Sequence, residues 1–281
     1  MSSRATPHAR LRIEPAPLAE RLERFVQDTV GRRFGFEKVV LNLSGGVDSA
    51  TVAYLAARAL GPGNVLALRL PYARIDSPSL ERARLVIDAL GIAHETIDIT
   101  TIVDAYADTQ PSMTWHRRGN VQARVRMLVQ FDKMAEHQAF PIGTGVKTES
   151  LFGYFTEHGD DAPKIEPLGD LYKTQVWQLA AHLGVPEAII AAAPTAGLEP
   201  DQTDEGDFGM RYETIDLILS HLEGGYRDAE IVLQGVSQDE IDAVRARVRA
   251  THRKRLPVLV PLVQPAPIDP TLFLSRGLEE P

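Results

Sequence analysis

The sequence contains no cysteine, and no apolar run in it approaches the roughly 20 residues that a membrane-spanning helix needs. The missing cysteine excludes disulfides, thiolate metal sites and a cysteine nucleophile within this polypeptide. The most apolar stretch, Leu256 to Val263, is short and is interrupted by Pro257 and Pro261. These absences favour a soluble protein whose chemistry uses oxygen and nitrogen side chains.

The sequence also lacks an internal linker and a secretion signal. Its 281 residues are 44% hydrophobic, which is enough for one large core, and no Ser- or Gly-rich segment divides them. The N-terminus, with Arg4 and Arg10, has no apolar segment of the kind that a signal peptide requires. We therefore expect a cytoplasmic protein with a single domain over 1–281, a flexible tail over 1–12 and a C-terminal extension over 256–281.

Charge is unevenly distributed along the chain. The formal net charge of −8 argues against nonspecific nucleic-acid binding, which depends on neutralising phosphates. Basic residues nevertheless crowd one stretch near the C-terminus, where Ile241, Val244 and Val248 recur at helical spacing. Two interpretations stay open, a solvated helix face or a set of cations that closes over phosphates. The basic cluster comprises Arg245, Arg247, Arg249, Arg253, Lys254 and Arg255.

A glycine-rich turn joins an expected strand to an expected helix. The apolar run 39–43 precedes Ser44-Gly45-Gly46-Val47-Asp48-Ser49, and the Ala- and Leu-rich segment 50–60 follows it. Adjacent glycines let backbone N–H groups approach a ligand, and a helix N-terminus adds partial positive charge, so the turn predicts a phosphate cradle. Asp48 adds an oxygen ligand of the kind that Mg²⁺ prefers. The alternative is an ordinary turn in which Asp48 and Ser49 cap the helix.

Strands alternate with helices up to Thr144, which indicates an α/β protein with a Rossmann-like, doubly wound parallel sheet. Beyond Leu171 the pattern becomes helical, so we expect additional C-terminal helices. Ser77-Pro78 places a capping residue before a proline at the first helical position. The expected strands are 39–43, 65–70, 94–99 and 140–144, and the expected helices are 50–60, 80–90, 123–136, 172–183, 212–222 and 238–253.

A second constellation follows the fourth expected strand. Gly143-Thr144-Gly145-Val146-Lys147-Thr148-Glu149 again ends a strand with small residues and places a carboxylate just inside the next helix. Taken alone, this is consistent with a turn and a helix-dipole partner. Because ligands of such sheets bind outside the carboxyl ends of the strands, Glu149 and Asp48 are expected at the same edge. The pair would suit a Mg²⁺ ion bound to substrate phosphates.

Ser-Gly-Gly-x-Asp-Ser after a strand, without a Walker G-x-x-x-x-G-K-[ST] pattern, resembles the PP-loop ATP pyrophosphatases. The resemblance implies an adenine nucleotide alpha hydrolase-like fold and cleavage of ATP between its α and β phosphates. Within this superfamily the chain is similar to ammonia-dependent NAD synthetases, which convert deamido-NAD, ATP and ammonia to NAD, AMP and pyrophosphate through an adenylated intermediate. The motifs that carry the likeness are 44–49, 119–127, 143–149, 167–174, 194–198, 204–206 and 252–257.

The resemblance implies roles for individual residues. Asp48 and Glu149 would hold Mg²⁺, Lys173 and Thr195 would stabilise the leaving pyrophosphate, and Asp160 would lie near the reacting carboxylate and help ammonia lose its proton. The implied ATP site comprises Ser44, Gly45, Gly46, Val47, Asp48, Ser49, Thr144, Lys173 and Thr195. The implied deamido-NAD site comprises Asn120, Arg124, Asp160, His252 and Arg253, partly across the interface of a homodimer.

The sequence departs from the family pattern at two places. The loop that commonly reads Gly-Asp-Gly-Gly-x-Asp is here Gly159-Asp160-Asp161-Ala162-Pro163-Lys164, so its second acidic residue is replaced by lysine. Lys164 cannot accept a proton or bind Mg²⁺ as aspartate would. Val146 stands where a polar residue is usual. These departures leave the acceptor end of the reaction as the least defined part of the prediction.

Two other functions remain as alternatives. One is a different PP-loop adenylating ligase, such as a tRNA-modifying enzyme that uses the cluster from Arg245 to Arg255 to bind RNA. The absence of cysteine argues against the thiolating members of that group. The other is a noncatalytic nucleotide sensor. For an amidating enzyme, the absence of a cysteine-dependent glutaminase means that nitrogen comes from free ammonia or from a separate subunit.

Overall fold

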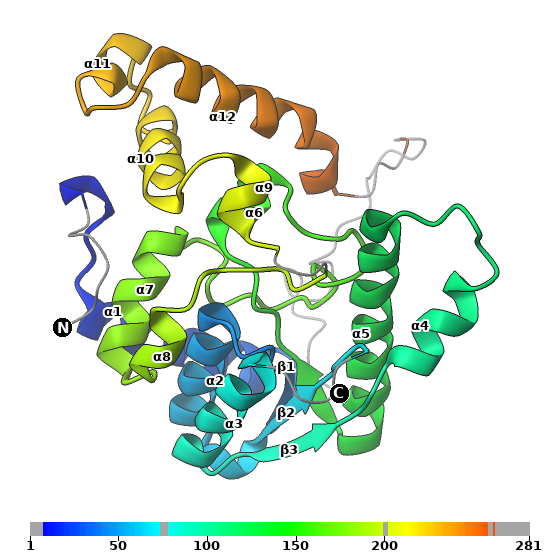
Figure 1. The fold of residues 1–281 in the computed structure, drawn as a ribbon. Coiled ribbons are helices and arrows are strands. Elements are labelled where there is room, and N and C mark those ends of the chain that lie inside the picture. The colour runs from blue at the N-terminus through cyan, green and yellow to red at the C-terminus, as the bar shows by residue number, and fades with distance from the viewer. Residues whose placement is uncertain (1–7, 74–77, 199–201, 258–260, 262–281) are drawn as a thin grey trace.

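A four-stranded parallel sheet with the order β3-β2-β1-β4 forms the centre of the molecule (Figure 1). The computed structural model describes residues 8–73, 78–198, 202–257 and 261. The parallel order confirms the α/β, doubly wound fold expected from the sequence. The strands are β1 (Lys38–Asn42), β2 (Val65–Arg69), β3 (Ala93–Thr96) and β4 (Ala139–Pro141).

Helices cover both faces of this sheet. Helices α2 and α3 contact it on one side, with α1 and α7 behind α2, while α5 packs against β1 and β4 and carries α4 on its flank (Figure 1). The longer helices are α1 (Pro15–Gln27), α2 (Val47–Leu60), α3 (Pro78–Leu90), α4 (Thr100–Ala107), α5 (Trp115–His137), α7 (Lys173–Leu183), α10 (Tyr212–Glu223) and α12 (Gln238–Ala250). The short ones are η1 (Ala9–Leu11), η2 (Asp28–Arg33), η3 (Pro62–Asn64), α6 (Lys147–Phe152), α8 (Glu187–Ile190), α9 (Asp204–Phe208), α11 (Asp228–Val232) and η4 (His252–Arg255).

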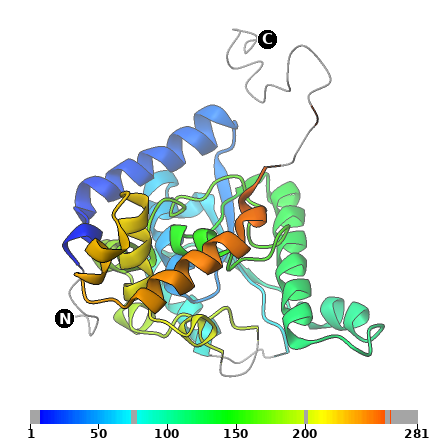
Figure 2. The same cartoon turned by 90° about the horizontal axis from the view of Figure 1, so that it is seen from above.

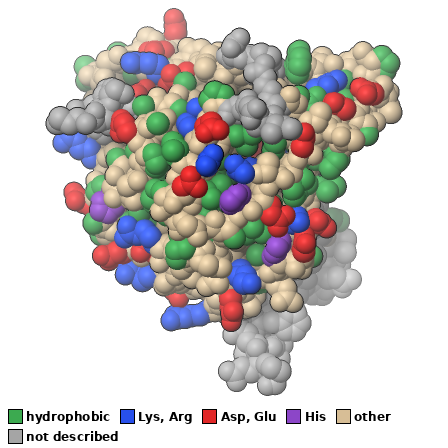
Figure 3. Space-filling model, turned by 60° about the horizontal axis from the view of Figure 1, so that its bottom comes forward, with side chains coloured by type: hydrophobic (Ala, Val, Ile, Leu, Met, Phe, Trp, Pro, Cys, Tyr) green, Lys and Arg blue, Asp and Glu red, His purple; other side chains and the backbone are tan. Residues whose placement is uncertain are grey.

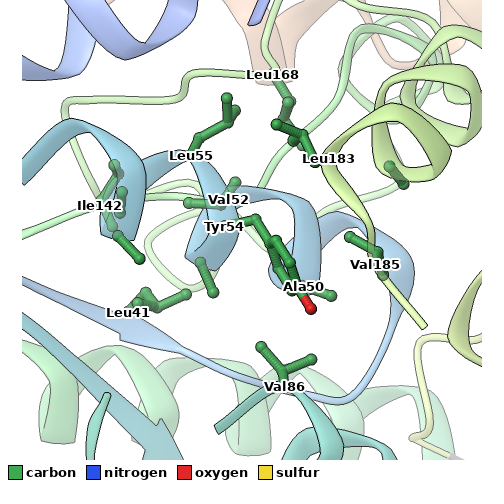
Figure 4. Close-up of a cluster of buried hydrophobic side chains, with 14 of the residues drawn as sticks. Leu41, Ala50, Val52, Tyr54, Leu55, Val86, Ile142, Leu168, Leu183 and Val185 are labelled. Carbon is green, nitrogen blue, oxygen red and sulfur yellow. The ribbon is translucent and has the colours of Figure 1, made fainter. Parts of the chain in front are cut away.

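The alternation of side chains along β1 explains why its three central residues, 39–41, are all apolar. Val39 and Leu41 belong to the core beneath α2 and α7, whereas Val40 belongs to the core beneath α5, and all three are fully buried. Successive side chains of a strand point to opposite faces, so a strand covered on both sides needs apolar residues at every position. Figure 4 shows Leu41 and Ile142 meeting Val52 and Leu55 of α2 in the larger core.

The C-terminal helices form a second apolar cluster beside the sheet. Ile215 and Ile218 of α10 pack with Ile241 and Val244 of α12, and all four are almost completely buried. Helix α12 contacts α6, which follows the turn after β4, and Figure 2 shows α12 lying across that part of the molecule. The additional C-terminal helices expected from the sequence are confirmed, and both α10 and α12 contact α6.

The limits of the helices and strands differ from those expected from the sequence mainly around α5. This helix begins at Trp115 and not near residue 123, because the Thr114 hydroxyl accepts a hydrogen bond from Arg117 N–H and caps it. Helix α4 was not expected. Strand β3 ends at Thr96 and not at Ile99. Beyond the strand, the Ile99 N–H donates a hydrogen bond to the backbone oxygen of Pro71. Strand β4 ends at Pro141, and Ile142 forms an isolated parallel bridge with Ile165.

The two ends of the chain were expected to be a tail and an extension. Leu11 is 2% exposed within the α10 and α12 cluster, and Arg10 donates to the backbone oxygen of Ser220 at 2.8 Å. Residues 8–12 therefore differ from the flexible tail expected over 1–12, because Leu11 occupies a place in the core. Residues 1–7, the capping residue Ser77 and most of the extension over 256–281 lie outside the described residues.

Candidate active site

The two glycine-rich turns lie next to each other at one edge of the sheet. Strands β1 and β4 are neighbours and parallel, and the chain leaves the first of them toward α2 and the second toward α6. The sheet order reverses direction between these strands, and such a switch point leaves a crevice outside the carboxyl ends. The expected proximity of the turns after β1 and β4 is thus confirmed by the topology.

Hydroxyl groups hold the turn after β1 in place. Ser49 Oγ accepts a hydrogen bond from the backbone N–H of Ser44 at 3.2 Å and donates to the backbone oxygen of Gly46 at 3.1 Å. Ser44 Oγ lies 3.1 Å from Ser49 Oγ and accepts from the Gly46 N–H at 3.2 Å. The two serines therefore fix the shape of the turn from within, which leaves its outer surface open.

Position 45 requires glycine because helix α3 lies very close to it. Its φ of +82° lies in the region that favours glycine, and an added Cβ would meet the backbone oxygen of Ser79, in α3, at 2.0 Å. Arg82 of the same helix donates from Nε to the Gly45 backbone oxygen at 3.0 Å. The first glycine of the motif thus lets α3 approach the turn closely.

Helix α2 begins three residues earlier than expected, at Val47, so Asp48 and Ser49 lie in its first turn. Its N-cap is Gly46, and no side chain in the described residues caps the helix. The interpretation of Asp48 and Ser49 as capping residues is therefore wrong. An uncapped helix N-terminus presents backbone N–H groups and a partial positive charge, and this arrangement suits an anionic group.

Lys173 lies between Asp48 and Glu149. Its Nζ atom is 2.6 Å from Asp48 Oδ2 and 2.7 Å from Glu149 Oε1, and its side chain is only 1% exposed. The two carboxylates are each about one-fifth exposed, at 19% and 20%. The structure therefore joins three residues that the resemblance placed in one site, although Asp48 and Lys173 are 125 positions apart.

The charges of this trio shift its ionisation. Burial by itself lowers the pKa of a lysine, but Asp48 and Glu149 outweigh it and raise the pKa of Lys173 above its usual value. Burial raises the pKa of Glu149; Lys173 opposes this rise and Asp48 adds to it. Lys173 is thus charged at neutral pH, and the trio carries one unbalanced negative charge when both acids are ionised.

Two carboxylate oxygens at this site have no hydrogen-bond partner among the described residues. They are Oδ1 of Asp48 and Oδ1 of Asp204, and Asp204 is 3% exposed at the start of α9, where Tyr212 donates to its other oxygen at 2.8 Å. Buried carboxylate oxygens without partners are suited to a hard divalent cation. Asp204 belongs to the 204–206 motif, but sequence reasoning gave it no role.

Asp216 supports the site from behind. This fully buried residue of α10 accepts hydrogen bonds from the Thr148 hydroxyl and from the Thr174 backbone N–H at 2.8 Å. Burial raises the pKa of Asp216 to about 6, against the effect of these donors. Asp216 thereby connects α6, which carries Glu149, to α7, which carries Lys173. Nothing in its sequence position singled it out.

Three residues expected to bind deamido-NAD are linked through one loop. The Thr156 hydroxyl donates to Asn120 Oδ1 at 2.8 Å, and its backbone N–H donates to Asp160 at 2.9 Å. Arg124 Nε donates to the backbone oxygen of Glu157 at 3.2 Å. Helix α5 and the 156–161 loop therefore hold Asn120, Arg124 and Asp160 together. Burial raises the pKa of Asp160.

A cavity of about 370 Å³ opens beside this loop and reaches Glu149. Glu166 is prominent in it, and its pKa is raised to about 7 by burial and by the neighbouring charges of Asp160 and Asp161. Glu166 was not expected at the site, and Lys254 was considered only as a member of the basic cluster near the C-terminus. The charged residues of the cavity wall are the acids Glu149, Asp160, Asp161 and Glu166 and the bases Lys164, Lys254 and Arg255.

Other predicted residues lie apart from these contacts. Thr195 is in an exposed loop, where its hydroxyl accepts from the Gly197 N–H at 3.0 Å. Arg253 pairs with Glu157 at 2.8 Å, and His252 is exposed in η4. Thr144 is half-buried in the turn after β4. For these four residues, as for the other predicted site residues, the predicted roles stay predictions.

Most of the basic cluster near the C-terminus is used inside the protein. Arg245 pairs with Asp228 at 2.6 Å, and Arg247 donates to the backbone oxygen of Phe152 at 3.0 Å. Lys254 donates to the Gly153 oxygen, and Arg255 to those of Leu151 and Val248. The contacts with residues 151–153 bind α12 and η4 to the end of α6, and the Arg245 ion pair binds α12 to α11. On the face shown in Figure 3, acidic and basic side chains are interspersed.

The departure at Val146 has a structural explanation. The Val146 side chain is 0% exposed and belongs to the large core, while the polar side chains of this segment belong to residues next to it in the sequence. Valine at this position therefore serves packing.

Together, the parallel sheet, the uncapped helix after β1 and the acid–lysine trio define a nucleotide-binding α/β protein.

Comparison with known proteins makes this assignment more specific. The sequence pattern of the NAD synthase family matches residues 18–257. An NH(3)-dependent NAD(+) synthetase of Chlorobaculum parvum is 46% identical over 246 residues, covering 86% of this chain and 88% of that protein. A protein of the same name from Trichlorobacter lovleyi is 43% identical and covers 89% and 92%. The chain belongs to the NAD synthase family, which confirms the resemblance inferred from its motifs.

Solved structures agree with this assignment. The NMN synthetase of Francisella tularensis has a TM-score of 0.79 at 32% identity, covering 89% of this chain and all (100%) of that one. The NH3-dependent NAD synthetase of Campylobacter jejuni has a TM-score of 0.75 at 31% identity, with the same coverage.

No helix in the described part of this chain is long and apolar enough to cross a membrane.

Proposed function

We propose that this protein is an ammonia-dependent NAD synthetase, which amidates deamido-NAD with ammonia at the expense of ATP and releases AMP and pyrophosphate. The observation that carries the proposal is the buried Lys173, held between Asp48 and Glu149 at the switch point of the sheet. A desolvated cation beside an uncapped helix N-terminus is the arrangement that a polyphosphate leaving group needs. The proposal includes the cytoplasm as the place where the enzyme acts.

The reaction needs two steps and no covalent enzyme intermediate. The nicotinate carboxylate of deamido-NAD attacks the α-phosphorus of ATP and pyrophosphate leaves; ammonia then attacks the activated carbonyl carbon and AMP leaves. The backbone N–H groups at the start of α2 would orient the phosphates, and Lys173 would neutralise charge on the departing pyrophosphate. Asn120 and Arg124 would position deamido-NAD beside the 156–161 loop, with Asp160 near the reacting carboxylate.

The donor set at this site fits a magnesium ion. Asp48 and Glu149 would hold it, with the free Oδ1 atom of Asp48 as an available ligand, and when bound it supplies Lewis-acid stabilisation of the phosphates. Lys173 contacts one oxygen of each carboxylate, Oδ2 of Asp48 and Oε1 of Glu149, so the ion would bind at the other oxygens while the lysine stays in place and faces the phosphates.

The test is a direct assay of the reaction. The purified protein is incubated with ATP, Mg²⁺, ammonium and deamido-NAD, and AMP and NAD are measured. A folded, ATP-binding protein that forms no NAD would defeat the proposal. Asp48→Ala and Glu149→Ala should each abolish AMP release, whereas full activity in either variant would remove that residue from the metal site. Exposed Asp170→Asn, 95% exposed at its side chain, serves as the control.

A parallel incubation replaces deamido-NAD by nicotinate mononucleotide. The structural similarity to the NMN synthetase of Francisella tularensis makes this comparison necessary, since an NMN product requires the same amidation on the smaller nucleotide.

The alternative functions considered from the sequence are not favoured. A tRNA-modifying enzyme would need the basic cluster for RNA, but Arg245, Arg247 and Arg255 are engaged in internal contacts.

Dimerisation is part of the same proposal. Helices α4 and α5 carry four large apolar side chains that are about half exposed, between 46% and 56%. They are Ile102, Tyr106, Trp115 and Leu128. Because α5 also carries Asn120 and Arg124, a partner bound along this helix would lie beside the acceptor site. Sedimentation velocity should show a dimer that Leu128→Glu weakens; an unchanged monomer for the unsubstituted protein would contradict it.

A further inference from the structure

Glu166 lies against the turn that follows β4. The pairing of Ile165 with Ile142 and a hydrogen bond from the Gly143 N–H to the Ile165 oxygen at 2.7 Å place it there. An added Cβ on Gly143 would come within 2.9 Å of Glu166 Cγ, and one on Gly145 within 2.8 Å of its Oε1. The two glycines therefore leave the space that the Glu166 side chain occupies, at the wall of the cavity that reaches Glu149.

The three acids at this end of the cavity have different partners. Asp160 accepts the Thr156 N–H at 2.9 Å and Asp161 accepts the Gly159 N–H at 3.2 Å, so both hold the backbone of their own loop. The Glu166 carboxylate accepts no hydrogen bond and forms no ion pair within the described residues, although it is partly buried. Of the three, Glu166 has the most capacity left for a ligand.

The position of Glu166 compensates for the departure at Lys164. The family loop commonly ends in a second acidic residue, and this chain has a lysine there, exposed at the cavity wall. Two residues later, Glu166 brings a carboxylate back to the same cavity. The basic side chains beside it have other partners, because Lys254 and Arg255 donate to backbone oxygens of Gly153 and Leu151.

We propose that Glu166 binds the ammonia substrate and replaces the acid that the loop lacks at position 164. The proposal rests on the amidation described above. Ammonium would donate N–H bonds to Glu166 and pass one proton to its carboxylate, which becomes a carboxylic acid. The nitrogen lone pair freed in this way then attacks the carbonyl carbon of the adenylate, and AMP leaves with the electrons of the broken carbon–oxygen bond. The attached nitrogen releases its second proton to water, which leaves the neutral amide.

The local charges suit this role. Burial, with Asp160 and Asp161 as further causes, raises the pKa of Glu166 to about 7. The charged groups that share its cavity are these two acids, Glu149 and the bases Lys164, Lys254 and Arg255. A group whose pKa lies near the working pH both accepts and returns protons efficiently. Glu166→Gln keeps the shape and removes this capacity.

The test separates the two half-reactions. Exchange of radioactive pyrophosphate into ATP, dependent on deamido-NAD and measured without ammonium, reports the first step alone. We expect Glu166→Gln to leave this exchange within about twofold of the unsubstituted protein and to raise the KM for ammonium about tenfold or more in the full reaction. Glu187→Gln, an exposed residue on α8, should change neither quantity.

A second variant tests the replacement itself. Lys164→Asp in the Glu166→Gln background restores the acid where the family has it, so it should lower the KM for ammonium again by several-fold. An unchanged ammonium KM in Glu166→Gln, an equal loss of pyrophosphate exchange, or no recovery in the double variant would each overturn the proposal. If the unsubstituted protein makes no NAD, the amidation itself fails; an active protein insensitive to Glu166→Gln defeats only the role of Glu166.

Discussion

Thr148 and Asp216, 68 residues apart in the sequence, share a hydrogen bond of 2.6 Å in the interior of the protein. The same Thr148 hydroxyl accepts the backbone N–H of Lys173 at 2.9 Å. One hydroxyl group therefore sets the position of the helix that carries Glu149 relative to the helix that begins at Lys173. The spacing of the acid–lysine trio depends on this buried link.

Thr148→Val should reduce activity strongly although it touches no substrate. Valine keeps the shape but leaves the Lys173 N–H and one Asp216 oxygen without their partner, so we expect a loss of about 1–3 kcal/mol in unfolding free energy. Urea unfolding and the NAD assay measure both effects. Thr51→Val is the matched control, because the buried Thr51 hydroxyl bonds only to Val47 within its own helix. Equal activity in the two variants would contradict the prediction.

Asp216 should make stability depend on pH. Its pKa is about 6 in the folded protein and about 4 in an unfolded chain, so between these values the folded state holds a proton that the unfolded state has released. Its contribution to stability is therefore full below about pH 4 and is lost as the pH rises through 6. The difference in unfolding free energy between the unsubstituted protein and Asp216→Asn should fall by about 2 kcal/mol over this window.

The control for this pH effect is Asp228→Asn. Hydrogen bonds from Arg245 and Gln238 lower the pKa of Asp228 to about 2, so it is ionised in both states over most of the window. The difference in unfolding free energy between Asp228→Asn and the unsubstituted protein should change little from pH 4.5 to 7. A difference for Asp216→Asn that is equally flat, or that grows with pH, would show that the carboxyl group does not retain its proton.

Lys173→Met should destabilise the protein and abolish activity. It leaves Asp48 and Glu149 facing each other at a poorly solvated site, a change that typically costs about 3 kcal/mol or more. The double variant Lys173→Met/Glu149→Gln removes one of the two charges and should regain part of the stability but none of the activity. Chemical unfolding of the single and double variants gives the coupling energy. A double variant no more stable than Lys173→Met would argue against the ion pairs.

Gly45→Ala and Gly61→Ala separate backbone strain from steric conflict. Both glycines have positive φ, +82° and +85°, so alanine strains both by about 1–2 kcal/mol. Only at Gly45 does the new methyl meet a backbone oxygen, that of Ser79. We expect Gly45→Ala to be the less stable variant by at least about 1 kcal/mol and to bind ATP more weakly. Similar melting temperatures for the two would contradict this.

The central sheet was predictable because its signals are local. The run 39–43 is apolar except at Asn42, and the two glycine-rich turns mark where strands end. Helix α4 and the first turns of α5 carried a weaker pattern, and their limits depend on a cap at Thr114 and on contact between the two helices. Local patterns could not provide such tertiary information.

The candidate site was predictable only in part for the same reason. Asp48 and Glu149 were found from their places after two strands, and Lys173 from a motif. Asp216 and Glu166 were not found, since an isolated carboxylate in a sequence gives no sign that folding will bury it. Their importance comes from burial and from neighbours distant in the chain, such as Thr148, and only the folded structure provides these.

The placement of Lys173 also bears on how a metal ion reaches the site. Its ammonium group balances one of the two negative charges of Asp48 and Glu149. A divalent ion bound at the remaining oxygens, such as Oδ1 of Asp48, would therefore lie close to a buried cation that repels it. A polyphosphate brings negative charge to both cations and offsets this repulsion. Magnesium and ATP should consequently bind with strong mutual dependence, each weakly in the absence of the other.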